Sequence, residues 1–467
     1  MLSQTALEVF EGQKICITTR VGKDNLIRQF PWLSSLHPDG RHLVDATNRM
    51  HTRHDSEKLQ RRIHRLVYAS DEVGEASRFL WLPPSVQEAW SWLDPEKPAV
   101  VVIDSWDALV EQYLGAPGTG EDRLPDRGEI ERLVLQQMGK SRAHLVLVLE
   151  TDQQTQLDYL ADGIAVTSRE KVDGRLERWL TLPKLRGIPI ENDTYPFTLQ
   201  GGKFEALTPL IVKGLPRAVR SAPEPAPREG FLWPGDRSYA EHFGWLPLGQ
   251  FSLLEHDPGT PFAFLPILVG PSIHHTLQRG GFVAMVPPPW RSVEELWNTY
   301  CANFPADAKV EQRFRVVSPV SPASEELRKI VLKAGETESA EFRSKSVLGV
   351  IDFLRKGAAL KVPAMLVAHT SGLVAATGLS PTDPRWSAFA AEVQQRLLRE
   401  TYLHTVLAGP TGDLVVEDAK TYASIHLLAR WRQGQVLLYG VNPRTRGFLL
   451  LEQPQGDQEP FALLEIK

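Results

Sequence analysis

The stretch AVVVID, residues 99–104, decides the fold class, because a run of apolar residues ends there on a single acid. Short runs rich in β-branched residues are typical of strands buried on both faces of a parallel sheet. Similar runs lie on either side of it: KICIT (14–18), RHLVDA (41–46), RFLWL (78–82) and HLVLVLE (144–150). Stretches with helical character separate these runs, so the sequence predicts an α/β domain with a mainly parallel sheet flanked by helices.

A different pattern follows at residues 163–187, GIAVTSREKVDGRLERWLTLPKLRG. Two extended segments flank Asp173 and Gly174, a pair that suits a two-residue hairpin turn because both residues tolerate positive φ. We therefore expect a C-terminal β-hairpin extension of the sheet.

The second half of the chain repeats this order. FEGQKICITTRVG (10–22) matches the outline of PLGQFSLLEHDPG (247–259), and HLVLVL from His144 aligns with HTVLAG from His404. The hairpin segment DGRLERWLTLPKLRG aligns with QGQVLLYGVNPRTRG, and these later matches share one offset. A constant offset over several elements indicates an internal repeat.

A proline-rich segment from Leu215, LPRAVRSAPEPAPREGFLWPGDRS, lies between the two copies and has the composition of a linker. We therefore predict two tandem domains of one α/β fold, residues 1–212 and residues 241–467, joined by a Pro-rich linker at residues 213–240.

Composition limits the class of protein. The 467 residues are 42% hydrophobic and 23% charged, which is the balance of a globular chain with an ample core. No apolar run approaches the roughly 18–20 residues that cross a bilayer, and the start MLSQTALEVFEGQ lacks the features of a secretion signal, so we expect a cytoplasmic protein. The two cysteines, Cys16 and Cys301, indicate no disulfide framework and no metal site. A net charge of -5 gives no global attraction to nucleic acid.

Two segments resemble the KaiC branch of the RecA-fold ATPases: VVIDSWDALVEQYLG from residue 101, and the stretch from LADGIAV at residue 160 to KFEAL at residue 207. KLRG, from Lys184 to Gly187, and TYPF from Thr194 are the most specific pieces. The resemblance covers most of residues 8–208 and, more faintly, residues 245–452. It implies tandem RecA-like domains, each with a Walker A loop of the form GxPGTGKT, a magnesium-associated Asp at the end of the fourth strand, and KLR residues that reach a neighbouring subunit's nucleotide.

The first phosphate loop departs from this pattern. ICITTRVGKDNLIRQF, from Ile15, keeps Gly22 and Lys23 but is about two residues short and places Asp24 where the hydroxyl belongs. A working loop needs several backbone N–H groups, a lysine and a hydroxyl around the phosphates and magnesium. One charge-assisted hydrogen bond of roughly 1.5–3 kcal/mol from Lys23 does not replace that cradle. We expect no tightly bound cofactor, and ATP with magnesium only at low affinity through Gly22, Lys23 and Asp104.

Two other loops are weaker candidates. LLEHDPGTPFAF (253–264) lacks the lysine and runs into Pro261, which has no N–H to donate, and PAMLVAH (363–369) lacks a terminal acid, so we expect the second nucleotide site to be lost. GAPGTGED (115–122) resembles a phosphate loop in its letters, yet it follows a helical stretch and ends on Glu121 and Asp122. We interpret it as a surface loop.

Three residues of the first copy carry what remains of nucleotide chemistry. Asp104 is either a magnesium-associated carboxylate or an ordinary strand-end acid that caps the next helix with Ser105. Lys184 and Arg186, two apart on a predicted strand, share one face and have the charges that address a phosphate. By themselves they could be solvated edge charges; the resemblance favours trans-acting or interface residues.

A basic segment needs a separate interpretation. HPDGRHLVDATNRMHTRHDSEKLQRRIHRL (37–66) concentrates histidines and arginines. His51 and His54 have the spacing of one helical face, but no recognised ligand pattern accompanies them, so no metal site is expected. The basic residues of this segment either contact nucleic acid or lie on a solvated helix; they are Arg53, Lys58, Arg61, Arg62 and Arg65.

The sequence also lacks the acidic residues that ATP hydrolysis requires in this family. Hydrolysis in this family uses a carboxylate at the end of the second strand, and only Asp45, Ala46 and Thr47 stand there. The leading hypothesis is therefore a pseudo-ATPase, a regulatory or structural subunit of a ring or filament that contacts the nucleotide site of an active partner. The alternatives are a weak ATPase that uses Gly22, Lys23 and Asp104, and a nucleic-acid-associated RecA relative.

Overall fold

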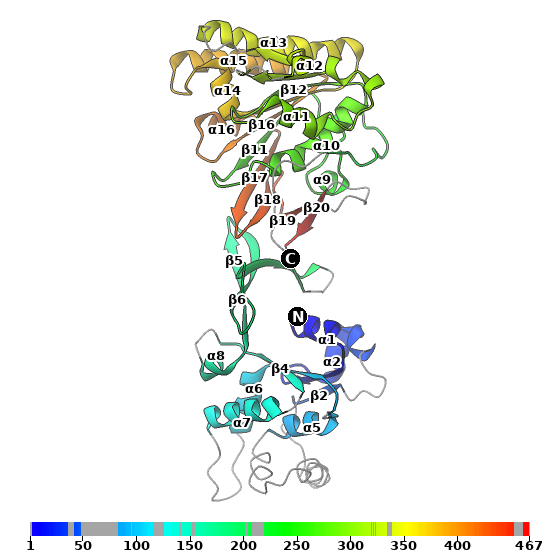
Figure 1. Ribbon diagram of the computed structural model, residues 1–467, viewed down its shortest axis with the longest axis vertical. Helices are drawn as coiled ribbons and strands as arrows, with labels where there is room; N and C mark the ends of the chain where they lie inside the picture. Colours follow the sequence, from blue (N-terminus) through cyan, green and yellow to red (C-terminus); the bar gives the residue numbers. More distant parts are fainter. Residues whose placement is uncertain are drawn as a thin grey trace, which may run out of the picture. The chain divides into compact units, whose positions relative to one another are not determined.

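We analysed the protein in a computed structural model (Figure 1). The structure describes residues 2–35, 42–47, 83–94, 96–114, 126–140, 142–151, 155–200, 204–207, 219–318, 320, 322, 324–333, 339–452 and 461–466.

The chain forms two compact units. Unit 1 comprises Met1–Val166, Leu182–Glu191 and Gly201–Phe204, and unit 2 comprises Thr167–Thr181, Asn192–Gln200 and Glu205–Lys467. The division passes through the predicted hairpin, whose turn belongs to unit 2. The predicted boundaries at residues 212 and 241 stay a prediction.

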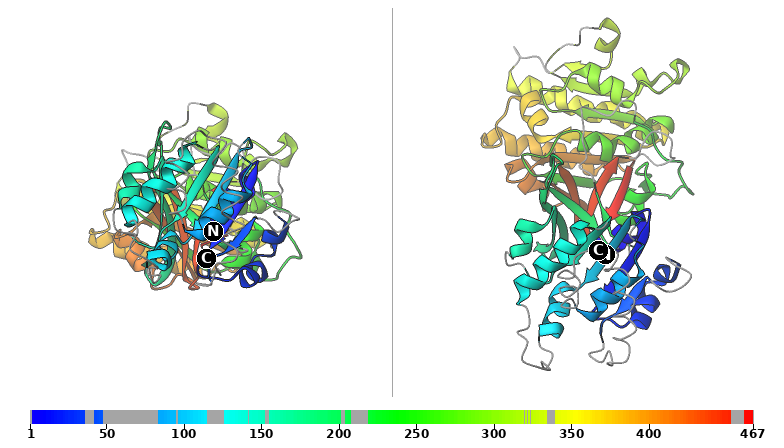
Figure 2. Two further views of the ribbon diagram at one scale, coloured as in Figure 1. Left: turned by 90° about the horizontal axis from the view of Figure 1, so that it is seen from below. Right: turned by 60° about the horizontal axis from the view of Figure 1, so that its bottom comes forward.

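Unit 1 contains a four-stranded sheet in the order β2-β1-β3-β4, and all its pairs are parallel. The strands are β1 (Gln13–Thr18), β2 (Leu43–Asp45), β3 (Ala99–Asp104) and β4 (Ala143–Val148). The helices are α1 (Leu2–Val9), α2 (Lys23–Gln29), α5 (Pro84–Trp92), α6 (Trp106–Leu114), α7 (Arg127–Lys140) and α8 (Gln156–Leu160). Figure 2 shows these strands, coloured blue to cyan, between helices.

The quoted run at 99–104 forms the buried β3, as predicted. Val101 and Ile103 join a core that includes residues of α5, α6 and α7, whereas Val100 and Val102 join a core on the other face that includes Leu7 of α1. Successive side chains of a strand point to opposite faces, so a continuous apolar run supplies both cores. Each fully buried side chain of this size contributes roughly 1.5–3 kcal/mol.

Unit 2 is built on a ten-stranded mixed sheet in the order β14-β13-β12-β15-β16-β11-β17-β18-β19-β20. Pairs from β14 to β17 are parallel, and those from β17 to β20 are antiparallel. The parallel strands are β11 (Phe251–His256), β12 (Phe282–Val286), β13 (Phe314–Ser318), β14 (Val331–Lys333), β15 (Ala364–His369), β16 (Leu403–Pro410) and β17 (Ile425–Arg432). The antiparallel extension adds β18 (Gln435–Asn442), β19 (Gly447–Glu452) and β20 (Phe461–Glu465).

Helices cover both faces of this sheet (Figure 1). One core contains residues of α10 (Phe264–Gln278) and α11 (Val293–Tyr300) against Val283 and Met285 of β12. The other contains residues of α13 (Ala340–Leu360), α14 (Thr370–Thr377), α15 (Pro384–Leu398) and α16 (Leu414–Ala419) against Ala284 and Val286. The alternation along β12 explains why each strand serves both layers.

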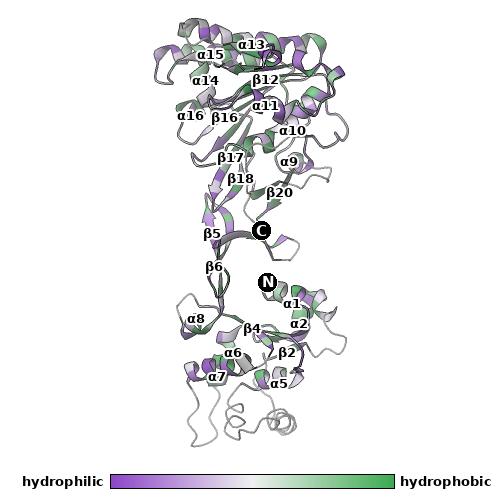
Figure 3. Ribbon diagram, in the orientation of Figure 1, coloured by the Kyte–Doolittle hydropathy of each residue, from purple (hydrophilic) through white to green (hydrophobic). Residues whose placement is uncertain are grey.

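The predicted hairpin consists of β5 (Gly163–Val172) and β6 (Arg175–Leu185), followed by β7 (Thr194–Thr198) and β8 (Glu205–Ala206) in the sheet order β5-β6-β7-β8. Asp173 and Gly174 have φ values of 50° and 74°, which confirms the two-residue turn. Figure 3 shows hydrophilic residues in part of β5, whose sequence includes Arg169, Glu170 and Lys171. In unit 2, Trp179 of β6 packs with Leu437 and Tyr439 of β18.

The strand orders do not show two copies of one sheet. In unit 1, β1 pairs directly with β3. In unit 2 their predicted counterparts, β11 and β15, are separated by β16, the counterpart of β4. The run RFLWL at 78–82 lies outside the described residues. A mixed α/β architecture is therefore confirmed, and the tandem RecA-like arrangement stays a prediction.

The described part of the proline-rich segment packs within unit 2. The Val219 amide donates to the Thr299 carbonyl at 2.9 Å, and Trp233 donates its indole N–H to the Ala222 carbonyl at 3.2 Å. Ala222 and Trp233 are both buried, at 1% exposure each. Short strands β9 (Phe231–Leu232) and β10 (Leu246–Pro247) pair across this segment, ahead of and behind helix α9 (Arg237–His242).

Candidate functional site

The carboxyl edge of the sheet in unit 1 is the first place to expect a ligand. In open α/β sheets, ligands bind beyond the carboxyl ends of the strands, where the strand order reverses. β1 pairs with β2 on one side and β3 on the other, and Thr18 is level with both Asp45 and Asp104. Asp104 and Asp45 therefore lie on either side of Thr18 at this edge.

The N-terminus of α2 is occupied by an acid of the same chain. Gly22 is the N-cap residue, and the backbone N–H of Lys23 donates to Asp45 Oδ2 at 2.8 Å. A Cβ placed on Gly22 would lie 3.4 Å from the same oxygen. The first N–H groups of a helix have no partner inside the helix and attract anions. In this protein the Asp45 carboxylate is an anion at this helix N-terminus.

The second oxygen of Asp45 is engaged as well. Asp45 Oδ1 accepts hydrogen bonds from the Thr47 backbone N–H at 2.9 Å and from the Thr47 hydroxyl at 2.5 Å. A general base needs its carboxylate directed at a water or substrate proton. These contacts direct Asp45 toward Lys23 and Thr47, and the loss of the catalytic acid stays a prediction.

Asp104 lies next to a tightly connected turn. The Thr19 amide donates to the Asp104 carbonyl at 2.9 Å, and the Ser105 amide donates to the Thr19 hydroxyl at 2.8 Å. Ser105 Oγ accepts from the Ala108 amide at 3.3 Å, so Ser105 caps α6; a capping role for Asp104 itself stays a prediction. No group of three or more His, Cys, Asp or Glu residues in the described part of the chain could hold a metal ion. A magnesium role for Asp104 stays a prediction.

Both cysteines are buried free thiols. Burial, together with the charge of Asp104, raises the pKa of Cys16 to about 12, and burial also raises the pKa of Cys301. A thiol with a raised pKa is a poor nucleophile and a poor metal ligand at neutral pH.

The sequence analysis missed an ionic network beside this edge. Arg127 donates to Asp107 Oδ1 at 2.6 Å and to Glu131 Oε1 at 2.7 Å. Burial alone would lower the pKa of Arg127, and these two hydrogen bonds raise it. Asp107 also accepts from the Glu150 amide at 2.7 Å, and Arg20 pairs with the Glu150 carboxylate. The network joins α6, α7 and the end of β4 to the loop before α2; only the spacing of Arg127 and Glu131 is visible in the sequence.

Lys184 and Arg186 converge on the end of α8. Lys184 Nζ donates to the carbonyls of Asp158 at 2.8 Å and Tyr159 at 3.2 Å. Arg186 Nη2 donates to the same Tyr159 carbonyl at 2.8 Å, and its Nη1 donates to Asp162 at 3.2 Å. Cations are stabilised at helix C-termini. Both side chains therefore reach one point on the surface, where Tyr159 is 75% exposed.

The matching edge of unit 2 carries a histidine pair instead of a phosphate site. Nε2 of His256, at the end of β11, lies 3.4 Å from Nε2 of His369, at the end of β15. His256 Nδ1 is 2.9 Å from the Asp257 carbonyl, and His369 Nδ1 accepts from the Ser371 amide at 3.2 Å. These partners assign neutral rings with the shared proton on His369 Nε2. Burial lowers both pKa values, that of His369 to about 4.

The loop after β11 is also unlike a phosphate loop. Thr260 is 8% exposed, and its hydroxyl has no hydrogen-bond partner among the described residues. Pro261 follows it, and α10 begins at Phe264. The loss of the second nucleotide site stays a prediction.

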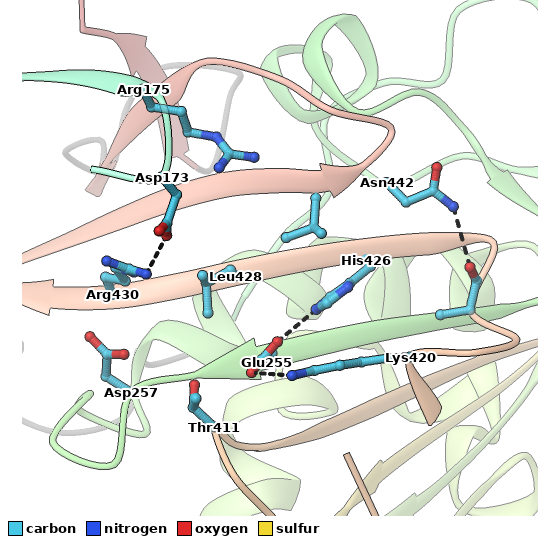
Figure 4. A pocket seen from close by; sticks show the side chains of 12 residues that line it. Asp173, Arg175, Glu255, Asp257, Thr411, Lys420, His426, Leu428, Arg430 and Asn442 are labelled. Carbon is cyan, nitrogen blue, oxygen red and sulfur yellow. Dashed lines mark hydrogen bonds and ion pairs between the residues drawn. The ribbon is translucent and has the colours of Figure 1, made fainter. Parts of the chain in front are cut away.

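A pocket of about 600 Å³ opens beside β11 and β17 of unit 2 (Figure 4). Glu255 lies at its floor, where Oε2 accepts from His426 Nε2 at 2.8 Å and Oε1 accepts from Lys420 at 2.9 Å. Burial alone would raise the pKa of Glu255, but the hydrogen bonds from His426 and Lys420 lower it to about 2. Asp173 of the hairpin turn pairs with Arg430 at the opposite wall (Figure 4).

The sequence analysis missed this pocket too. Its signal is a charged residue inside an apolar strand, Glu255 in FSLLEH, and a histidine inside another, His426 in IHLLAR. Buried charges in proteins are paired, so each of these residues requires a polar neighbour. Nothing in the sequence tells which two strands bring them together.

Two predicted segments lie outside the described residues. These are GAPGTGED at 115–122 and the basic residues from Arg53 to Arg65. The nucleic-acid alternative therefore stays a prediction.

Comparison with known proteins finds a P-loop family. Residues 85–183 match the model of the GvpD gas vesicle protein, P-loop domain. Protein GvpD2 of Halobacterium salinarum (strain ATCC 700922 / JCM 11081 / NRC-1) is 32% identical over 218 residues, which cover 44% of this chain and 42% of that protein. Protein GvpD1 of the same organism is 37% identical over 112 residues, or 24% of this chain and 20% of that protein. The matched regions thus span less than half the length of either relative.

Part of the chain is thus similar to a domain that is described as a P-loop domain. The region matched to the family model contains β3 with Asp104, all of β5 and β6 as far as Pro183, and it ends before Lys184 and Arg186. It does not include Gly22 and Lys23, which precede it. No helix among the described residues has the length and apolar character to span a membrane.

Proposed function

We propose that this chain is a P-loop-related regulatory protein that does not run its own ATP cycle and acts on a protein partner within an assembly. The observation that carries the proposal is the hydrogen bond from the Lys23 amide to Asp45 Oδ2 at 2.8 Å. An ATP phosphate that approached the N-terminus of α2 would have to displace this carboxylate.

Energetics favour the internal acid. Asp45 accepts hydrogen bonds from the Lys23 amide and from both the amide and the hydroxyl of Thr47. Hydrogen bonds to charged groups contribute roughly 1.5–3 kcal/mol each, and less where water competes. A phosphate that stayed near Asp45 would also experience repulsion from Asp45 and Asp24. We infer that ATP and magnesium bind unit 1 weakly at most, and that the KaiC-like features are degenerate.

The proposed action on the partner uses Lys184 and Arg186. Arg186 is 54% exposed and shares the Tyr159 carbonyl with Lys184, so both cations are available at one surface point. Backbone carbonyls are neutral acceptors, and a phosphate of a partner's nucleotide would attract both side chains more strongly. The two residues would then complete a nucleotide site that belongs to the partner.

The names of the relatives suggest where the partner belongs. The matched family is described as a gas vesicle protein. We propose that this chain works in a system of that kind, in the cytoplasm, and that its partner is an ATPase of the same system or a further copy of a related subunit.

A weak ATPase is the second candidate. It is favoured by the position of Gly22, Lys23 and Asp104 together at the carboxyl edge of the sheet, where an α/β protein binds its ligand. In this alternative Asp45 moves aside when Mg-ATP enters.

Thermal unfolding with Mg-ATP separates the two. Ligand at about a thousand times its dissociation constant stabilises a protein by roughly 4 kcal/mol, which shifts the unfolding midpoint visibly. We expect no shift for the isolated protein and no phosphate release above background. A shift together with phosphate release, both abolished by Lys23→Ala, would establish the ATPase and remove the pseudoenzyme proposal.

A further inference from the structure

A second pocket in unit 2, of about 510 Å³, is lined by arginines. It lies between the turn of the β5–β6 hairpin and the loop that joins β18 to β19. The three charged side chains that line it are Arg175, Arg444 and Arg446. Gly174, Thr445 and Ile466 form much of the rest of its wall.

The loop that carries two of these arginines is closed on itself. The Gly440 amide donates to the Thr445 hydroxyl at 2.8 Å, and the Thr445 amide donates to the Gly440 carbonyl at 3.0 Å. Arg175 joins the hairpin to this loop, because its Nε donates to the Thr445 carbonyl at 3.0 Å and its Nη2 to the Gly440 carbonyl at 2.6 Å. Arg175, Arg444 and Arg446 are therefore held close together before any ligand is present.

Arg444 lies against the hairpin turn. Its Nη2 donates to the Asp173 carbonyl at 3.2 Å. Gly174 has a φ of 74°, and a Cβ on it would approach Arg444 Nη2 to 2.9 Å. The turn thus needs glycine both for its backbone conformation and to leave space for the guanidinium.

Three carboxylates of this region already have partners, and one of these partners is Arg446 of the pocket. Asp173 pairs with Arg430, Glu177 accepts from the Tyr439 hydroxyl, and Glu465 pairs with Arg446. Arg175 and Arg444 donate only to neutral backbone carbonyls among the described residues. Neither Arg175 nor Arg444 donates a hydrogen bond to a carboxylate in the described part of the chain, although the charge of Asp173 also acts on Arg175.

The positive charges of Arg175 and Arg444 repel each other. Burial, and then the charge of Arg444, lowers the pKa of Arg175. Like charges are held together in folded proteins where another interaction offsets their repulsion, and arginine forks are suited to the planar, paired oxygens of phosphate. A volume of about 510 Å³ lies within the range of small-molecule sites, roughly 300–1,000 Å³.

We propose that the pocket formed by Arg175, Arg444 and Arg446 binds a phosphate-bearing small molecule. Arg175 fixes the loop, and the free donors of Arg444 and Arg446 contact the phosphate oxygens. The site is separate from the carboxyl edges of both sheets and from Lys184 and Arg186, so it goes beyond the function proposed above.

Calorimetric titration of the full-length protein with pyrophosphate tests the site. Chelator in the buffer removes magnesium, so that binding at Gly22 and Lys23 does not contribute. We expect binding that weakens with added salt, and a loss of about tenfold or more in the Arg444→Ala, Arg446→Ala double variant. Arg444→Lys keeps the charge but removes the fork, so it should lose an intermediate amount.

Arg432→Ala is the matched control, because it removes the same charge from an exposed position at the end of β17 that does not line the pocket. Thermal unfolding midpoints establish that each variant is folded. Failure of the wild-type protein to bind pyrophosphate at low salt would overturn the proposal. Equal weakening by Arg432→Ala would overturn it too, because general charge would then explain the binding.

Further titrations distinguish the source of the phosphate. ATP that binds more tightly than tripolyphosphate indicates a nucleotide, and equal affinities indicate an inorganic phosphate chain. If the protein binds an oligonucleotide but does not bind pyrophosphate, and pyrophosphate does not displace the oligonucleotide, the result contradicts a small-molecule site. The Lys184→Ala, Arg186→Ala variant should bind pyrophosphate as the wild-type protein does, so failure of the partner hypothesis leaves this result unaffected.

Discussion

Replacing Asp45 by alanine tests whether an internal acid closes the nucleotide edge of unit 1. The change removes the acceptor of the Lys23 amide and of two donors of Thr47. Asp45 is half-buried, so water replaces part of this bonding, and we expect the free energy of unfolding to fall by about 1–3 kcal/mol. Urea unfolding, followed by tryptophan fluorescence, measures this loss.

The same change should raise the affinity for Mg-ATP. Two unit charges about 4 Å apart near a protein surface repel by roughly 4 kcal/mol, and salt reduces this value. Since about 1.4 kcal/mol corresponds to tenfold in affinity, removal of the Asp45 charge should strengthen binding between tenfold and several hundredfold. Equilibrium titration with Mg-ATP measures the gain.

Thr47→Ala is the control for this experiment. It removes one hydroxyl donor to Asp45 and leaves the carboxylate beside the Lys23 amide. It should lower stability without a gain in ATP affinity. If wild-type protein and Asp45→Ala bind Mg-ATP with the same dissociation constant, Asp45 does not block the site and the reasoning is refuted.

Other predictions concern the hairpin, the pocket and the partner. Glu255→Gln should lower the free energy of unfolding of unit 2 by about 3 kcal/mol at neutral pH, because the folded pKa of Glu255 is about 2 against an ordinary 4.5. This contribution is complete above pH 4.5 and is lost as the pH falls toward 2. Urea unfolding of both proteins from pH 3 to pH 7 measures it, and a difference in stability that does not change with pH would contradict the prediction. Gly174→Ala should lower the free energy of unfolding by about 1–2 kcal/mol, because a Cβ strains the left-handed turn and forces Arg444 to move. An unchanged thermal unfolding midpoint would count against the close contact between residue 174 and Arg444. The Lys184→Ala, Arg186→Ala variant should abolish the effect on a partner's ATP turnover while its circular dichroism stays that of the wild type, and an unchanged partner rate would argue against the trans role.

The sequence predicted those elements whose cause is local. The run AVVVID formed the buried β3 because its apolar residues suit both faces of a parallel sheet, and Asp173 with Gly174 formed the expected turn because the two residues accept positive φ. Neither inference needs knowledge of distant residues. The strand of unit 1 at 78–82 and the basic segment stay predictions.

The neighbours of each strand could not be predicted. A pattern of apolar residues identifies a strand but does not give its place in the sheet. The sequence matches β4 with β16, yet β16 lies between β11 and β15, whereas β4 lies at the edge of its sheet beside β3. The contact of Asp45 with the Lys23 amide joins residues 22 apart, and that of His426 with Glu255 joins residues 171 apart. Such contacts depend on the strand order, which the sequence pattern left open.

Different side chains satisfy the polar groups at the carboxyl edges of the two sheets, and this difference suggests why an anion would bind at another place in the protein. In unit 1 the amide of Lys23 is satisfied by Asp45, and in unit 2 His256 and His369 satisfy each other and the Ser371 amide. A working phosphate loop leaves such amides without a partner until its ligand arrives, which costs stability in the empty state. Where side chains of the chain itself fill that role, the empty edge is already stable and ligand binding there gains little. Arg175 and Arg444 donate only to backbone carbonyls among the described residues, and an anion would accept hydrogen bonds from them more strongly than a carbonyl does.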